Sequence, residues 1–165
     1  MRKESTAAAA IHRLVWPICL IGAKHRGKHN VMTIAWVTQV SVDPLLVVAS
    51  ISPTRYTHDM IVHSGEFMLS ILTSEQKDIS SFCGFRSGRD IDKIAHLRLK
   101  TVPASVIGVP RLADCLANLE CKVVDRHLVG DHTLFVGEVV AADVAEQNLQ
   151  PLLMCQGKTL KLAVN

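Results

Sequence analysis

Aromatic residues are scarce in this sequence: Phe, Trp and Tyr together make up 4% of the 165 residues. A buried core must therefore be built mainly from Val, Ile, Leu and Ala. Hydrophobic residues make up 48% of the chain and charged residues 20%, which is typical of a globular protein and excludes an intrinsically disordered one. The length suits one domain, and no repeat or linker divides residues 1–165.

A strong charge imbalance is also missing. The formal net charge is +3, and no stripe of Lys and Arg is interleaved with aromatic residues, so we expect no nucleic-acid partner. The longest apolar stretch near the N-terminus, residues 14–23, contains Pro17 and is too short to span a bilayer. The first residues lack the apolar region of a signal peptide. We therefore expect a cytoplasmic protein with no membrane partner.

Several common site motifs are absent. The five cysteines are an odd number and form no C-x-x-C pair, which excludes a disulfide framework and a zinc signature. His58 and His63 are five residues apart, which does not place them on one helix face, so we expect no metal. Neither the GxGxxG pattern of a Rossmann dinucleotide site nor a P-loop occurs. Cys83, between Phe82 and Phe85, fits either a core position or a reactive thiol.

Apolar, β-branched runs separated by turn signals predict several strands. The expected strands cover residues 13–23, 31–42, 45–51, 66–72, 116–127 and 134–144, with a last short one at 160–162. Residues 24–30, Asp43-Pro44 and residues 129–132 predict turns, the last closing a hairpin. Pro17 places the first strand at an edge or a bulge. Residues 1–11 are expected to be loosely ordered.

The helices expected from this sequence are few and short. Residues 56–64 predict one helix, which stops before Gly65. Residues 73–76 match a capping box and predict a second helix that stops near Gly84. Residues 90–97 predict a third. Many strands, short helices and no βαβ rhythm together favour a closed antiparallel barrel.

The segment Ser50–Thr57 (SISPTRYT) is dense in hydroxyl groups and includes Arg55. It lies at a predicted strand-to-helix junction, where free backbone N–H groups and the helix dipole favour an anion. Arg55 offers a bidentate contact to a phosphate. The same residues also fit an ordinary strand end with an N-cap and a solvated arginine. Local pattern alone leaves both interpretations open.

His132 follows Gly130-Asp131, whose composition a hairpin turn explains by itself. A histidine is not required in such a turn, which favours a functional role. A single histidine at a turn is nevertheless often only a surface residue. The pattern does not decide between these two interpretations.

The motifs of this sequence follow one another in a definite order. The order is Asn30-x-Met-Thr-x-Ala-Trp36, Asp43-Pro44, Ser50–Thr57, Gly65-Glu-Phe67, Phe82-Cys-Gly84, Ser87-Gly-Arg-Asp90 with Asp92-Lys93, and Gly130-Asp-His132 with Gly137. In this order and spacing, residues 14–144 resemble the flavin reductase-like proteins, and most of all their flavoredoxin branch. The tail, residues 150–165, matches no part of that pattern.

The resemblance implies a mainly β fold, a six-stranded antiparallel split barrel with short helices, that forms a homodimer and binds FMN near the dimer interface. It implies that Arg55 and Thr57 take the FMN phosphate and that Lys93 reaches the flavin, where a cation raises the reduction potential. His132 is implied to lie beside the nicotinamide. The remaining cofactor-binding residues that it implies are Asn30, Met32, Thr33, Ala35, Trp36, Ser50, Ile51 and Ser52.

The function implied is an FMN-dependent oxidoreductase, in which NAD(P)H reduces the flavin and the flavin reduces an acceptor. That acceptor is a free flavin, a metal ion or a redox protein partner. Two alternatives stay open: a flavoredoxin-like electron carrier that does not react with NAD(P)H, and a binding module that has kept the fold without the flavin. The sequence identifies neither the acceptor nor a preference for NADH or NADPH, or for FMN or FAD.

Overall fold

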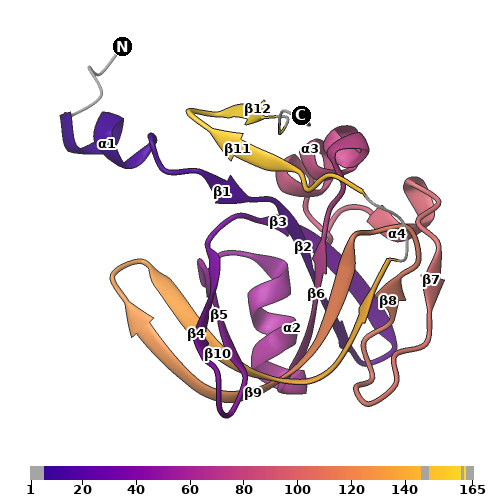
Figure 1. Cartoon of the computed structure of the whole chain (residues 1–165). Coiled ribbons are helices and arrows are strands. Elements are labelled where there is room, and N and C mark those ends of the chain that lie inside the picture. Colours follow the sequence, from indigo (N-terminus) through magenta and orange to yellow (C-terminus); the bar gives the residue numbers. More distant parts are fainter. Residues whose placement is uncertain (1–5, 146–148, 161, 163–165) are drawn as a thin grey trace.

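A computed structural model of the chain describes residues 6–145, 149–160 and 162. Its main sheet is antiparallel, with the spatial order β3-β2-β6-β9-β10-β5-β4 (Figure 1). These strands are β2 (Cys19–His25), β3 (Lys28–Ile34), β4 (Val37–Ser41), β5 (Leu46–Ile51), β6 (Glu66–Ile71), β9 (Ala117–Val129) and β10 (His132–Val144). Strands β3 and β4 follow each other in the chain yet lie at opposite edges of this order, so the sheet curls until its edges approach. This confirms the predicted mainly β, barrel-like fold.

The strand expected over residues 31–42 is two strands, so the main sheet has seven strands where six were expected. The chain bends at Ala35 and Trp36, where the Val37 N–H donates to the Ala35 carbonyl at 3.0 Å. The Ser50 N–H donates to the Trp36 carbonyl, also at 3.0 Å. The bend joins the two edges of the curled sheet and directs Trp36 toward the end of β5.

The strand expected over residues 13–23 is also interrupted, by Ile18, and gives β1 (Trp16–Pro17) and β2. Strand β1 is the edge of a small sheet of order β1-β11-β12, as expected for a strand that contains Pro17. Its partners are β11 (Leu153–Cys155) and β12 (Lys158–Leu160), so the unassigned tail forms a hairpin on the barrel. The strand expected at 160–162 ends at residue 160, and residue 161 lies outside the described residues.

The helices lie where the sequence predicts them, but not all of them have the predicted length. Helix α2 (Tyr56–Ser64) has the predicted bounds, and Gly65 ends it with φ 70°. The predicted capping box opens a short 3-10 helix, η1 (Ser74–Gln76), which continues into α3 (Lys77–Phe85). Helix α4 (Lys93–His96) is shorter than the expected 90–97, because Asp92 caps it through the Ala95 N–H at 3.0 Å.

At the N-terminus, expected to be loosely ordered over residues 1–11, residues 6–11 form helix α1 (Thr6–Ile11), which buries no residue. Residues 1–5 lie outside the described part. A separate two-stranded sheet pairs β7 (Thr101–Val102) with β8 (Arg111–Leu112). No helix in the described ranges is long and apolar enough to cross a membrane.

Two turns are shorter than the sequence indicated. The turn expected over residues 24–30 consists of Arg26 and Gly27, both with positive φ, and β3 already begins at residue 28. The turn expected over residues 129–132 consists of Gly130 and Asp131. Asn30 and His132 therefore lie in strands and not in turns. Pairing with the neighbouring strand holds their backbones rigidly.

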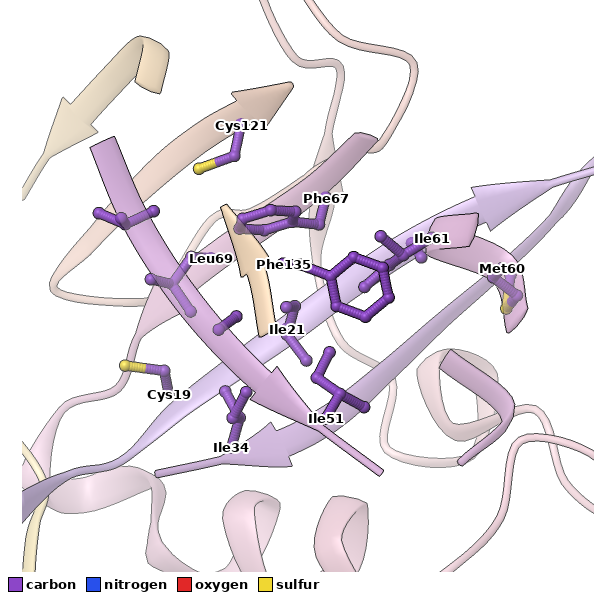
Figure 2. Packing of buried hydrophobic residues seen from close by; sticks show 13 residues of the cluster. Cys19, Ile21, Ile34, Ile51, Met60, Ile61, Phe67, Leu69, Cys121 and Phe135 are labelled. Carbon is purple, nitrogen blue, oxygen red and sulfur yellow. The ribbon is translucent and has the colours of Figure 1, made fainter. Parts of the chain in front are cut away.

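The barrel core is apolar and contains two of the few aromatic residues. Phe67 and Phe135 are fully buried among Ile21, Ile51 and Leu69 (Figure 2). Cys19 and Cys121 belong to the same cluster, and burial raises the pKa of each thiol to about 12. These cysteines are therefore neutral core residues.

Gly137 is required by the approach of Phe67 to the sheet. A Cβ at residue 137 would lie 2.5 Å from Cζ of the Phe67 ring, which is fully buried and has no room to move. We expect Gly137→Ala to lower the free energy of unfolding by about 1–3 kcal/mol, the usual cost of overpacking a core. Urea denaturation measures it. Gly84→Ala is the control, because its Cβ would meet Thr33 at an ordinary 3.5 Å; equal losses in both variants would contradict the packing argument.

Glu120 is a buried carboxylate that holds the loop before β8. It accepts hydrogen bonds from the backbone N–H groups of Ser105 and Val106 at 2.7 Å and of Ile107 at 3.1 Å. Burial alone would raise the pKa of Glu120, but these hydrogen bonds outweigh it and hold the pKa below its ordinary value.

A carboxylate with a lowered pKa stabilises the fold above its unfolded pKa, about 4.3 for Glu, and loses that contribution as pH falls through the folded pKa. We therefore expect stability to fall steeply with pH below about 4.3 in the wild type. Glu120→Gln, which cannot ionise, should be less stable at pH 7 and show a weaker pH dependence. Urea midpoints at several pH values measure this, and parallel curves for the two proteins would contradict it.

Candidate functional site

Two cavities adjoin each other beside β3 and the N-terminus of α2. The first, of about 260 Å³, is lined by Asn30, Met32, Thr54, Arg55, Tyr56, Thr57, Cys83, Gly84, Phe85, Arg86, Ser87, Gly88, Arg89 and Lys93. The second, of about 380 Å³, is lined by Met32, Thr33, Ile34, Ala35, Trp36, Ser50, Ile51, Ser52, Arg55, Gly84 and His132. They share Met32, Arg55 and Gly84. Every site residue predicted from the sequence lines one of the two.

The first cavity is strongly cationic. Arg55, Arg86, Arg89 and Lys93 all line it, and no Asp or Glu of the described residues does. It also lies at the start of α2, where Arg55 is the N-cap residue and no side chain caps the free N–H groups. Fixed cations and a helix N-terminus together suit an anion such as a phosphate.

The arginines of this cavity differ in how they are held. Arg89 donates to the Thr54 carbonyl at 3.1 Å and to the Asp59 carboxylate at 2.9 Å, and its guanidinium lies 5.3 Å from the Tyr56 ring centroid. Arg55 is exposed, and in the described part of the chain its side chain has no hydrogen bond or ion pair. Arg89 is thus anchored to the cavity wall, while the Arg55 guanidinium is available to a ligand.

The floor of the first cavity is a buried polar contact between β3 and α2. The Asn30 side-chain amide donates to the Thr57 hydroxyl at 2.8 Å, and both side chains are buried. Gly88 approaches Asn30 so closely that any Cβ there would collide with the Asn30 amide. Thr57 and Asn30, predicted as separate ligand contacts, form one joined unit.

Lys93 is almost completely buried, with 3% of its surface exposed. Its Nζ donates to the Val31 carbonyl at 2.9 Å and to the Cys83 carbonyl at 2.8 Å, which leaves one of its three N–H donors. Burial lowers the pKa of Lys93, and the charge of Arg55 lowers it further, against the opposing effect of Cys83. Lys93 therefore lines the first, cationic cavity and not the second cavity, which contains Trp36.

Cys83 lines the first cavity, but its thiol is not activated. Burial raises its pKa to about 11, although Lys93 acts in the opposite direction. The thiol is therefore protonated near neutral pH and lacks the thiolate character that redox chemistry needs. Of its two interpretations from sequence, the structure favours the core position.

The second cavity has an aromatic wall, made of two rings tilted at 46° to each other. The Trp36 and His132 ring centroids lie 4.8 Å apart, and Trp36 is half exposed at 49%. His132 Nδ1 lies 2.7 Å from the Asp131 carboxylate, which fixes the orientation of the imidazole. That hydrogen bond lowers the pKa of the exposed Asp131. Thr33 lines the same cavity, and its hydroxyl donates to the Ser80 carbonyl at 2.5 Å, which connects β3 to α3.

Some lining residues were not assigned a role from the sequence. Arg86, Gly88 and Arg89 lie in a loop without hydrophobic periodicity. The motif Ser87-Gly-Arg-Asp90 included Gly88 and Arg89, and no sequence motif marked Arg86. Phe85 is 92% exposed beside Gly84. The density of Gly, Ser and Arg in this loop is a signal from which an anion-binding surface could have been predicted.

Comparison with known proteins identifies the family. The model of the flavin reductase like domain matches residues 11–163, so the chain belongs to this family. A protein of Pyrococcus abyssi is 36% identical over 138 residues, or 82% of this chain and 79% of its own length. The NADH-dependent flavin reductase StyB of Pseudomonas fluorescens is 36% identical over 128 residues, 77% of this chain and 71% of that protein. The chain spans only 64% of a relative from Archaeoglobus fulgidus, which is 43% identical over 114 residues.

Solved structures agree with this assignment. An FMN-binding protein from Thermus thermophilus has a TM-score of 0.85 at 30% identity, covering 99% of this chain and 95% of that one. A flavoredoxin from Methanosarcina acetivorans has a TM-score of 0.83 at 27% identity, covering 92% and 86%. The predicted flavin reductase-like barrel is therefore confirmed.

Proposed function

We propose that this protein is an FMN-binding oxidoreductase that takes electrons from NAD(P)H and passes them to an acceptor. The observation that carries the proposal is the pair of adjoining cavities. One is cationic and lies at a helix N-terminus, and the other is walled by Trp36 and His132. A ligand that carries both a phosphate and a flat ring needs two adjoining cavities of these two kinds. Similarity to a protein named as an NADH-dependent flavin reductase supports the activity.

The residues fit the two ends of FMN. Arg55, the free N–H groups of α2 and the Thr57 hydroxyl would hold the phosphate. The backbone of Ser50, Ile51 and Ser52 would offer hydrogen bonds to the polar edge of the ring, and Met32, Thr33 and Ala35 would contact its body. When bound, FMN supplies the hydride chemistry, and the protein supplies orientation and charge.

His132 and Lys93 would have different tasks. The Asp131 carboxylate holds the His132 imidazole against Trp36, where the ring would position the nicotinamide. Two carbonyls anchor the Lys93 ammonium, and its remaining N–H would add positive charge to the flavin site.

The first test is the visible spectrum of the purified protein, before and after NADH is added without oxygen. We expect a yellow protein that bleaches within seconds, and NADPH in place of NADH tests the nicotinamide preference. A yellow protein that keeps its colour would be a flavoredoxin-like carrier reduced by a redox protein. A colourless protein that does not bind added FMN would leave only a flavin-free binding module.

We propose further that residues 1–165 act as one domain in a cytoplasmic homodimer. The cysteines are all free thiols, which suits a reducing compartment. Edge strand β4 and the turn after it expose Val40, Val42 and Leu45 at 52%, 82% and 42%, and unpaired apolar edges favour association. We expect light scattering to give twice the mass of the chain, which is 18.1 kDa. A mass equal to one chain would contradict the dimer.

A further inference from the structure

A third cavity, of about 540 Å³, is lined by helix α3, strand β3 and the β11–β12 hairpin (Figure 1). Thr33, Ala35 and Gly84 line both this cavity and the second one, so a ligand here would lie next to the proposed flavin ring. Met154 and Lys158 of the hairpin form another part of its wall. The hairpin belongs to the tail that matches no part of the flavin reductase-like pattern, so the resemblance assigns this cavity no ligand.

The charged side chains of the third cavity are both positive. Lys77 of α3 and Lys158 of β12 line it, and no Asp or Glu of the described residues does. Both lysines are exposed, and neither side chain forms a hydrogen bond or ion pair with another described residue. A cavity lined by charges of one sign attracts ligands of the opposite sign. Two unpaired ammonium groups on different elements therefore favour a ligand with an anionic group, and the lack of a carboxylate disfavours a metal ion.

The third cavity also has an apolar part that suits an aromatic ring. Ile18 is buried and Met154 is half-buried, whereas the Phe85 ring is 92% exposed beside the cavity. A phenyl ring and a thioether both make favourable contacts with an aromatic ligand. The exposed hydroxyl-bearing residues Ser81 and Thr159 also line the cavity and can donate to carbonyl oxygens of such a ligand.

We propose that the third cavity binds the electron acceptor, and that this acceptor is an aromatic quinone with an anionic substituent such as a sulfonate or a carboxylate. Lys77 and Lys158 would hold the anionic group, and Phe85 and Met154 would contact the ring. The wall shared with the second cavity would place the quinone beside the source of electrons. This inference rests on the proposed function, because NAD(P)H supplies those electrons.

The reaction proposed is a two-electron reduction of the quinone. A C–H bond of the nicotinamide of NADH breaks, and its electron pair and proton leave together. The quinone gains these two electrons and that proton, and solvent supplies a second proton. NADH thus becomes NAD⁺, and the two quinone carbonyls become the hydroxyl groups of a hydroquinone.

The first test is the binding of naphthalene-2-sulfonate, a redox-inactive analogue of such a quinone, to the full chain by isothermal titration calorimetry. FMN is present in excess so that the flavin cavities are filled, and we expect the same affinity without FMN. Lys77→Gln and Lys158→Gln should each weaken binding about twofold to fivefold, the scale of an exposed ion pair, and the double variant about tenfold. Lys122→Gln is the matched control, because Lys122 is exposed and lines none of the three cavities.

The second test is steady-state reduction of 1,2-naphthoquinone-4-sulfonate by NADH. Lys77→Gln and Lys158→Gln should raise its KM by the same factors and leave kcat nearly unchanged, because the lysines would hold the sulfonate and not the reacting carbonyls. With the uncharged 1,4-naphthoquinone, we expect the variants and the wild type to have the same KM.

The outcomes separate this inference from the proposed function. A protein that binds FMN and is reduced by NADH, but whose affinity for naphthalene-2-sulfonate is absent or unaffected by the lysine variants, would overturn the third-cavity assignment and leave the proposed function intact. Weaker binding of the sulfonate when FMN is present would place it in the flavin cavities and also overturn the inference. A protein that binds no flavin would overturn the proposed function, and the acceptor role of the third cavity with it.

Discussion

Arg55→Ala is expected to weaken FMN binding by about 1.5–3 kcal/mol, which is about 10- to 150-fold in the dissociation constant. The Arg55 guanidinium lines both proposed flavin cavities and has no competing partner in the described part of the chain. Its charge is therefore available to a phosphate. The loss of binding free energy should exceed the contribution of an exposed ion pair. The reason is that the N-terminus of α2 and the buried Lys93 add to the positive charge that Arg55 supplies to the proposed phosphate site.

A fluorescence titration of the flavin-free protein measures this effect. Arg55→Lys should keep most of the affinity, because it retains the charge and loses only the bidentate geometry. Arg126→Ala, on the distant part of β9, is the control for removing a surface arginine. An unchanged dissociation constant in Arg55→Ala would contradict the phosphate assignment.

His132→Ala should slow the reduction of bound flavin by NADH about tenfold to a hundredfold, the cost of a misplaced reactant. The affinity for FMN should stay nearly unchanged, because His132 lines only the ring cavity and the phosphate residues remain. Stopped-flow absorbance without oxygen measures the reduction rate.

The same hairpin supplies the matched control. His127 pairs with Asp125 at 2.8 Å, much as His132 pairs with Asp131 at 2.7 Å, but the His127 side chain is 61% exposed and lines neither proposed flavin cavity. His127→Ala should leave the rate of reduction unchanged. Equal slowing in both variants, or no slowing in His132→Ala, would contradict the nicotinamide role.

Local chemistry made part of this fold predictable. Gly65 and the Thr73–Gln76 capping box set their helix ends through contacts within a few residues, and both appear as expected. The break at residues 35–36 was not predictable, since nothing in that apolar run signals a turn. It exists because the curled sheet must bring β3 and β4 to opposite edges, and that is a tertiary requirement.

The candidate site, like the fold, was predictable only in part. The resemblance selected twelve residues, and all of them line two adjoining cavities. It did not show that the Lys93 ammonium is held by the Val31 and Cys83 carbonyls, because that contact depends on how α4 packs on β3. The hydrogen bond between Asn30 and Thr57 spans 27 positions and was hidden for the same reason.

The placement of the tryptophans gives this protein a built-in optical reporter. The chain has only two, Trp16 and Trp36, and their ring centroids lie 6.4 Å apart. Both indoles therefore report on the same end of the second cavity, where a bound flavin would quench their emission by energy transfer. The same emission would therefore report the binding of a flavin without any label.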